Sequence, residues 1–164
     1  EAPNELVGSN AECIYRVGAW GTAAGAEWPH KVAFWRDRLW LAGDQNIYAS
    51  VAGGYDSHEV DTQGEILADN ALNLTLTVGS VDKIRWLSPS KGALLIGTAG
   101  SEVALSEVTT NQALGPENVK FEPQSAEGSR EIEPVMVDDG VLFVRVGLRS
   151  TATRSSARAG ARAI

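Results

Sequence analysis

Short segments rich in β-favouring residues recur along the chain, and turn residues separate them. In "WPHKVAFWRDRLWLAG" (28–43), two apolar runs flank the charged pair "RD", which is the pattern of a β-hairpin with a solvated tip. The segment "LNLTLTV" (72–78) alternates apolar and polar residues, as expected of a half-buried strand. No segment shows a convincing helical period. This pattern predicts an all-β chain of antiparallel meanders and hairpins.

Three hairpins are expected, at 31–43, 93–108 and 134–146. The last contains "DDG", and an Asp-Gly pair between apolar runs is a strong short hairpin signal. Sandwiches, barrels and propeller blades all have short strands at this spacing, so the hairpins alone leave the arrangement of the sheets open. Further strands are expected at 46–50, 72–78, 83–88 and 119–124.

The charge of the chain divides it into an acidic body and a basic end. The 164 residues carry a formal net charge of −7, and residues 145–164 hold five arginines and no acid. Residues 1–144 therefore carry −12, from 9 basic and 21 acidic side chains. Composition predicts a loop-rich N-terminal segment (1–27), a single β domain (28–146) and a disordered, low-complexity, Arg-rich C-terminal tail (147–164).

The acidic body excludes several classes of protein. A duplex-binding surface needs clustered lysine and arginine, which residues 1–144 lack. No apolar run approaches the length of about 20 residues that crosses a bilayer, so no membrane association is expected. The lone Cys13 has no internal disulfide partner. A soluble protein of the bacterial cytoplasm, at least before any assembly, is the expectation.

Catalytic and metal-binding groups are sparse. His58 lies in "YDSHEVD", but neighbours in sequence rarely converge on one ligand, and a catalytic triad is defined by geometry. The nearby carboxylates do not have the spacing of an EF-hand loop, and "GTAGSE" (97–102) lacks the lysine of a phosphate-binding loop. We therefore expect no catalytic residue, no metal and no cofactor. A hydrolase on a β scaffold is the weakest of the hypotheses.

The main alternative for the tryptophans is between a role in the hydrophobic core and a role in a binding site. Trp35, Trp40 and Trp86 fall within predicted strands, where a large ring usually fills the space between packed sheets. Trp20 and Trp28 fall in stretches that resemble loops, so either role is open for them. If the rings were exposed, a carbohydrate- or surface-binding β domain would be the alternative function.

Several pieces of the chain, taken in order, resemble the tail nozzle or tail-stabilisation proteins of short-tailed bacteriophages and related prophages. The pieces include "WP", "RLWLAG", a Ser-Gly-Tyr turn ending at Tyr55, "IRWL", "LIGTAGSE", a Pro-x-Asn loop, "QSAEGS" and "VLFV". They correspond to residues 28–29, 38–43, 50–55, 84–87, 95–102, 116–118, 124–129 and 141–144. The resemblance thus covers about 28–144, and the basic sequence after it predicts a partial, truncated member of the family.

The resemblance implies a fold of β-propeller-like blades, here a partial propeller, and a mechanical function. Family members form a ring below the portal that continues the DNA channel and carries tail appendages. For this chain it implies self-association or contact with other tail and portal proteins, passive contact with viral DNA, and a place in the virion tail. It carries over no catalytic residue. Structural or interface roles are expected for an aromatic set: Trp28, Trp35, Trp40, Trp86 and Tyr55.

Overall fold

The computed structural model describes residues 28–60, 65–77, 83–109, 112–138 and 140–147, together with the backbone of 152–156. Strands are the regular elements of these residues, and they form three antiparallel sheets. The first sheet contains β1 (Lys31–Trp35), β2 (Arg38–Gly43), β3 (Asn46–Ala49) and β4 (Leu72–Thr75). The second contains β5 (Ile84–Pro89), β6 (Leu94–Thr98), β7 (Glu102–Ser106) and β8 (Lys120–Ser125). The third contains β9 (Val135–Val137), β10 (Gly140–Val144) and β11 (Ala152–Ser156).

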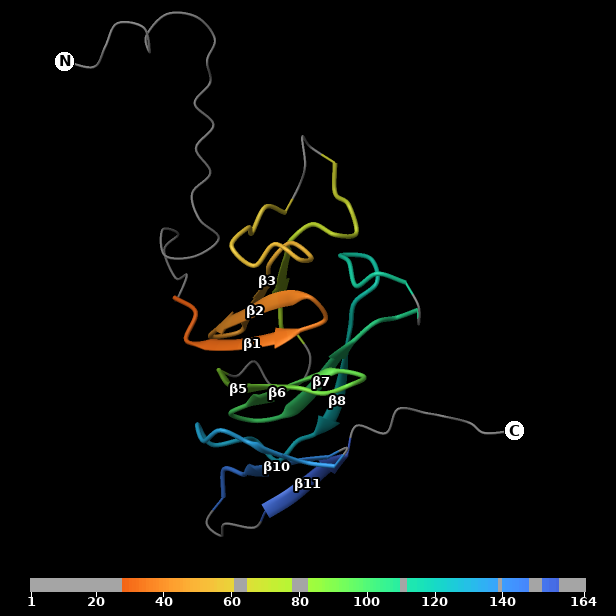
Figure 1. Cartoon of the computed structure of the whole chain (residues 1–164). Helices are drawn as coiled ribbons and strands as arrows, with labels where there is room; N and C mark the ends of the chain where they lie inside the picture. The colour runs from red at the N-terminus through yellow and green to blue at the C-terminus, as the bar shows by residue number, and fades with distance from the viewer. Residues whose placement is uncertain are drawn as a thin grey trace, which may run out of the picture.

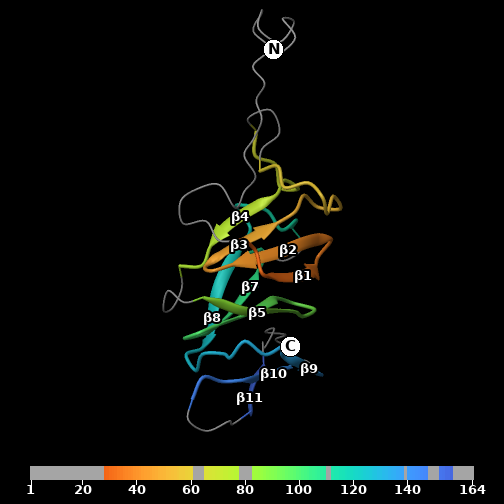
Figure 2. The same ribbon diagram turned by 90° about the vertical axis from the view of Figure 1, so that its left-hand side faces the viewer.

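In each sheet the strands neighbour one another in chain order, so each sheet is a meander. The sheets are stacked, with the second between the first and the third (Figures 1 and 2). The expected all-β class of meanders and hairpins is confirmed. Among the described residues, the three successive meanders pack face to face and do not close into a barrel or a ring.

All three expected hairpins form. β1 pairs with β2, β6 with β7 and β9 with β10. The first turn consists of Arg36 and Asp37, which both have positive φ (50° and 54°). Positive φ at both central residues is the geometry of a two-residue turn that matches the twist of paired strands. The charged pair therefore shapes the hairpin as well as standing at its tip.

The core lies in two layers, one on each face of the second sheet. Leu94 and Ile96 of β6 belong to the layer shared with the first sheet, while Leu95 between them belongs to the layer shared with the third. This alternation follows from the strand geometry, because successive side chains point to opposite faces. The near-continuous apolar sequence of β6 is thus explained by burial on both sides.

The structure differs from the expectations in two places. The last hairpin turns at Asp138, with φ of 52°, and Gly140 already pairs with Val137 in the sheet. The predicted disordered tail was wrong for residues 152–156, whose backbone pairs with β10 as β11. Backbone pairing with a sheet edge does not require apolar side chains, so composition underestimated it. The rest of the tail after 147 and the N-terminal segment, with Cys13 and Trp20, lie outside the described residues.

Candidate functional site

A buried arginine holds the loops of the first and second sheets together. Arg38 is 2% exposed, and its guanidinium donates hydrogen bonds to four backbone carbonyls. The acceptors and their distances are Ser50 (2.6 Å), Asn70 (2.7 Å), Ala68 (2.9 Å) and Leu114 (2.9 Å). Burial lowers the pKa of Arg38, and the charge of Asp69 partly offsets that effect. The rigid fork of donors suits this task, since it satisfies several acceptors at once.

The loop that offers Leu114 to Arg38 is itself organised by Asn118. The side-chain oxygen of Asn118 accepts from the backbone N–H of Thr109 at 2.7 Å, and its amide donates to carbonyls of the same loop, including Ala113 at 3.1 Å. Asn118 is the asparagine of the Pro-x-Asn motif. Its side chain thereby fixes the connection between β7 and β8 against the first sheet.

A second polar node joins β7 to the connection that follows β8. The buried carboxylate of Glu102 accepts hydrogen bonds from the hydroxyls of Ser125 and Ser129, the latter at 2.7 Å. The backbone N–H of Ser129 donates to the carbonyl of Thr98 at 2.7 Å. Gly128 precedes it with φ of 71°, and a Cβ there would lie 2.2 Å from the carbonyl oxygen of Ala99. Only glycine fits this turn.

Replacing Ser129 with alanine is expected to reduce the free energy of unfolding by about 1–3 kcal/mol, because the buried carboxylate of Glu102 loses a donor. Urea denaturation followed by tryptophan fluorescence measures the change. Ser106→Ala at the partly exposed end of β7 is the control, with an expected change below about 0.5 kcal/mol. Equal effects of the two substitutions would contradict the role of Ser129.

Ion pairs at both ends of β1 connect the first sheet to the second sheet and to the connection between β8 and β9. Lys31 of β1 lies 2.9 Å from Glu131, and Arg85 of β5 lies 3.4 Å from the other oxygen of the same carboxylate. The hydrogen bond and charge of Lys31, with a contribution from Arg85, lower the pKa of Glu131. Arg36 pairs with Glu107 and lies 5.1 Å from the centre of the Trp35 ring. Ion pairs of this kind at a protein surface contribute at most about 1 kcal/mol each.

The outward face of the first sheet is apolar. Val32 and Phe34 are 62% and 63% exposed, while Ala33 and Trp35, which alternate with them along β1, are buried against the second sheet. Phe34 meets the ring of Tyr55 edge to face, with centroids 5.4 Å apart. Strand pairing places Leu41 beside Val32 and Leu39 beside Phe34. We call this surface the first end face: Val32, Phe34, Leu39, Leu41 and Tyr55.

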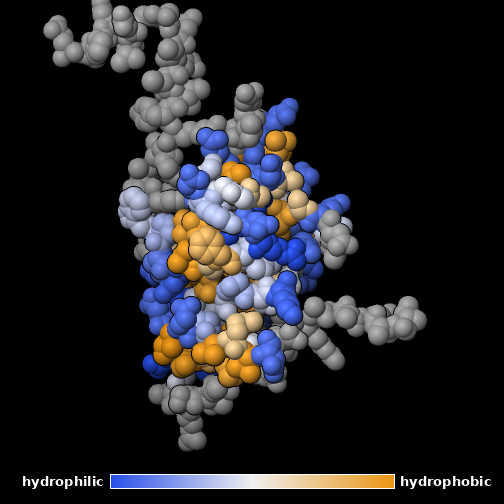
Figure 3. All heavy atoms as spheres, in the orientation of Figure 1, coloured by the Kyte–Doolittle hydropathy of each residue, from blue (hydrophilic) through white to orange (hydrophobic). Residues whose placement is uncertain are grey.

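In the third sheet, the outward side of β9 and β10 is also apolar. Val141 and Phe143 of β10 are buried against the second sheet, so Leu142 and Val144 point the other way. Strand pairing places Val135 of β9, 62% exposed, beside Leu142. We call this surface the second end face: Val135, Val137, Leu142 and Val144. Figure 3 shows apolar residues gathered over β1 and β2 and at the foot of the stack, where the third sheet lies.

The aromatic candidates divide between core and surface. Trp35, Trp40 and Trp86 are buried, as expected from their strands. The indole N–H of Trp35 donates to the carbonyl of Ser90 at 2.7 Å, and that of Trp40 to the carbonyl of Trp35 at 3.0 Å. Trp28 is 66% exposed and lies in the segment that precedes β1. Tyr55 is exposed within the first end face.

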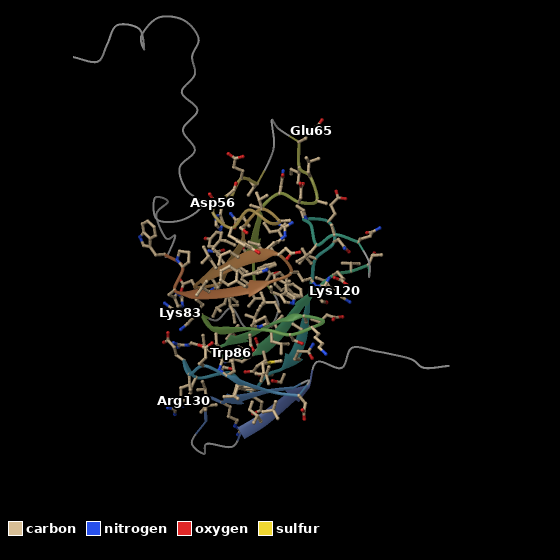
Figure 4. All side chains as sticks on the ribbon, in the orientation of Figure 1. Asp56, Glu65, Lys83, Trp86, Lys120 and Arg130 are labelled. Atoms are coloured by element: carbon tan, nitrogen blue, oxygen red, sulfur yellow. The ribbon has the colours of Figure 1, made fainter. Side chains whose placement is uncertain are left out.

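Trp86 is the large side chain between the second and third sheets (Figure 4). Its ring lies 5.8 Å from that of Phe143 and covers Gly97, where a Cβ would come within 2.0 Å of the indole. The glycine of "LIGT" therefore leaves the room that this tryptophan occupies.

Sequence analysis did not predict Arg38 as a buried node, or the two end faces. A signal for Arg38 exists in the sequence, because its charge stands at the start of the apolar segment "RLWLAG". That segment alone predicts only a strand. The exposed face of β1 had no signal, because Val32, Ala33, Phe34 and Trp35 are all apolar.

The described residues contain no cluster of three or more histidine, cysteine or acidic side chains that would hold a metal ion. Burial lowers the pKa of His58, and Asp56 opposes this shift. A pocket of about 460 Å³ lies between the loops 66–68 and 112–118, and Glu117 is the ionisable residue of its described lining. These groups do not bring an acid, a base and a nucleophile together in the described part.

The chain matches no protein-family model, and comparison with curated proteins finds no similar sequence. Within the described residues, no helix has the length and apolar character needed to span a membrane.

Proposed function

We propose that this chain is a structural component of a phage or prophage tail, in the nozzle or head–tail connection, and that it acts through subunit interfaces. The observation that carries the proposal is the pair of apolar end faces, on opposite sides of one stack of sheets. Monomeric soluble proteins rarely leave two such surfaces uncovered. A protein that works by assembly needs them.

The polar nodes support the resemblance on which the proposal depends. Arg38, Asn118, Glu102 and Ser129 belong to four separate motifs of the resemblance, and each has a buried polar role. Buried polar residues in four motifs of the resemblance are what we expect if those motifs maintain the same fold in this chain and in the family. Burial of Trp35 within that scaffold removes a ring from the alternative carbohydrate-binding surface.

The charge of the body suits contact with passing DNA. Because residues 1–144 carry −12, a channel wall made from them would repel phosphates instead of retaining them. The proposed partners are further copies of the chain and other tail or portal proteins. The proposed location is the virion tail, after synthesis in the bacterial cytoplasm.

The proposal is tested on particles released after prophage induction in the bacterium that carries the gene. We expect purified particles to contain peptides from 28–144 and antibody against the chain to label the tail in electron micrographs. Particles assembled after deletion of the gene serve as the control. Normal, infective particles without the chain would contradict the proposal.

The acidic body is expected not to retain duplex DNA at 0.15 M salt, about the physiological ionic strength. A chain ending at residue 147 is compared with the full chain in a filter-binding assay with a 30-base-pair duplex, about three helical turns of B-DNA. Tight binding by the shortened chain, with a steep salt dependence, would contradict passive contact with DNA.

A further inference from the structure

We propose that the pocket between the connections 66–68 and 112–118 binds a small organic cation, in which an ammonium group is attached to an apolar body. This inference does not depend on the proposed function, because it concerns a pocket within one copy of the chain. We call the site the loop pocket. Its described lining includes five apolar residues and one carboxylate: Ile66, Leu67, Ala68, Ala113, Pro116 and Glu117.

The apolar lining supplies the first argument. Ile66 and Leu67 follow each other in the chain, and they are 68% and 44% exposed. Ala113 and Pro116 line the pocket from the connection that precedes β8. The volume of about 460 Å³ lies within the range of small-molecule pockets, about 300–1,000 Å³, which are mostly apolar. An apolar ligand body of this size would cover exposed aliphatic side chains.

Buried polar side chains hold both walls of the loop pocket, and this is the second argument. Arg38 donates hydrogen bonds to one carbonyl in each of the two connections. The amide of Asn70, a residue that is 4% exposed, donates to the carbonyl of Glu65 at 3.2 Å. The amide of Asn118, 8% exposed, donates to the carbonyl of Ala113 at 3.1 Å. Because both walls are fixed from within, a ligand would meet a preformed pocket and lose little affinity to ordering.

The charge of the surrounding segments favours a cation as the ligand. The described segments at this end of the molecule carry five acids and no lysine or arginine: 51–60, 65–71 and 112–118. Glu117 lines the pocket, while Glu65 and Asp69 flank the residues 66–68. Figure 4 shows Asp56 and Glu65 at this end of the molecule. Carboxylates at the edge of an apolar pocket attract a ligand that carries a positive charge.

The cations that other elements bring toward the pocket already have partners. The guanidinium of Arg38 lies beneath the walls, where it is surrounded by backbone carbonyls and opposed by the charge of Asp69. Lys120, at the start of β8, lies 3.0 Å from the carboxylate of Glu122. Glu117 has no such partner among the ion pairs of the described residues, so its charge is available to a ligand.

A nuclear magnetic resonance titration of the full chain tests the site with three matched probes. Phenylbutylammonium, phenylbutanol and phenylbutanoate share one apolar body and differ in charge. We expect the ammonium to bind with a Kd of about 1–5 mM, as is usual for a ligand of this size, and to shift the amide signals of 66–68 and 112–118. The alcohol is expected to bind about fivefold more weakly, and the carboxylate more weakly still, because Glu117 repels it.

Two pairs of matched substitutions separate the charge from the apolar contact. Glu117→Gln is expected to weaken binding of the ammonium about fivefold and to leave the alcohol unchanged. Ile66→Ala is expected to weaken binding of both probes about threefold. Glu133→Gln and Ile132→Ala are the controls, because both residues are exposed in the connection before β9 and neither lines the pocket. Thermal unfolding confirms that each variant folds.

Three results would overturn the inference. Equal binding of the ammonium and the alcohol or the carboxylate would show that the pocket does not select a cation. Equal weakening by Glu117→Gln and Glu133→Gln would show that the ammonium only screens the acidic surface. Unshifted signals of 66–68 and 112–118 at about 10 mM ammonium, above the expected Kd, would show that the pocket binds no such ligand.

A lysine side chain of another polypeptide is the other possible source of an ammonium group. Its four-carbon stem would leave much of the pocket unfilled, so we expect Nα-acetyl-lysine methylamide to bind at least about threefold more weakly than phenylbutylammonium. Tighter binding of the lysine derivative would overturn the choice of a small molecule and assign the pocket to a polypeptide partner.

Discussion

Replacement of Arg38 with methionine is expected to lower the free energy of unfolding by about 3–5 kcal/mol, the largest effect among these predictions. Methionine has a comparable aliphatic stem, so the loss arises from the polar group. Without the guanidinium, four backbone carbonyls from three segments lose their donor inside the protein. The connections 65–71 and 112–118 then lose the link that holds them together. Chemical denaturation followed by circular dichroism measures the change.

Arg36→Met is the matched control, because Arg36 lies two residues away, at the hairpin tip, and its hydrogen bonds go to the exposed side, to the carboxylate of Glu107. An exposed ion pair of this kind contributes less than about 1 kcal/mol. Amide hydrogen exchange adds a local measurement. Protection is expected to fall in both connections in Arg38→Met, and to persist in Arg36→Met. A loss below about 1 kcal/mol for Arg38→Met would show that water replaces the guanidinium without cost.

Substitution of Gly97 by alanine is expected to destabilise the protein by about 2–3 kcal/mol, because the added methyl group has no room. The new Cβ would lie 2.0 Å from the indole of Trp86, which is buried and packed beside Phe143. Either the ring or the β5–β6 pairing must move. Urea denaturation measures the loss, and a shift in tryptophan emission reports the displaced ring.

Gly54→Ala is the control for Gly97→Ala, since its nearest atom would be the Cβ of Val51 at an ordinary 3.6 Å. Its expected effect is below about 0.5 kcal/mol. A double-mutant cycle identifies the cause, because Gly97→Ala should cost less when Trp86 is already leucine. The same cost in both backgrounds would mean that the clash with Trp86 is not the source of the loss.

The sequence alone determined the local elements and their class. Each hairpin has two apolar runs and a short polar turn between them, as around Arg36 and Asp37, and such signals act between residues close in the chain. The tryptophans of the predicted strands were also placed in the core, because a ring in a half-buried strand is covered in most arrangements of sheets. Catalytic and metal-binding groups are sparse in the sequence, and the sequence therefore predicts no catalytic site.

The tertiary structure alone decided which surfaces are covered. In β1 every residue from Val32 to Trp35 is apolar, and only the second sheet determines that Ala33 is buried and Val32 exposed. Arg38 became a buried node because carbonyls from distant parts of the chain converge on it. The period of apolar residues and the secondary-structure propensity depend only on residues that are close together in the chain. The faces that sheets present to one another depend on contacts between remote segments, and no local pattern contains them.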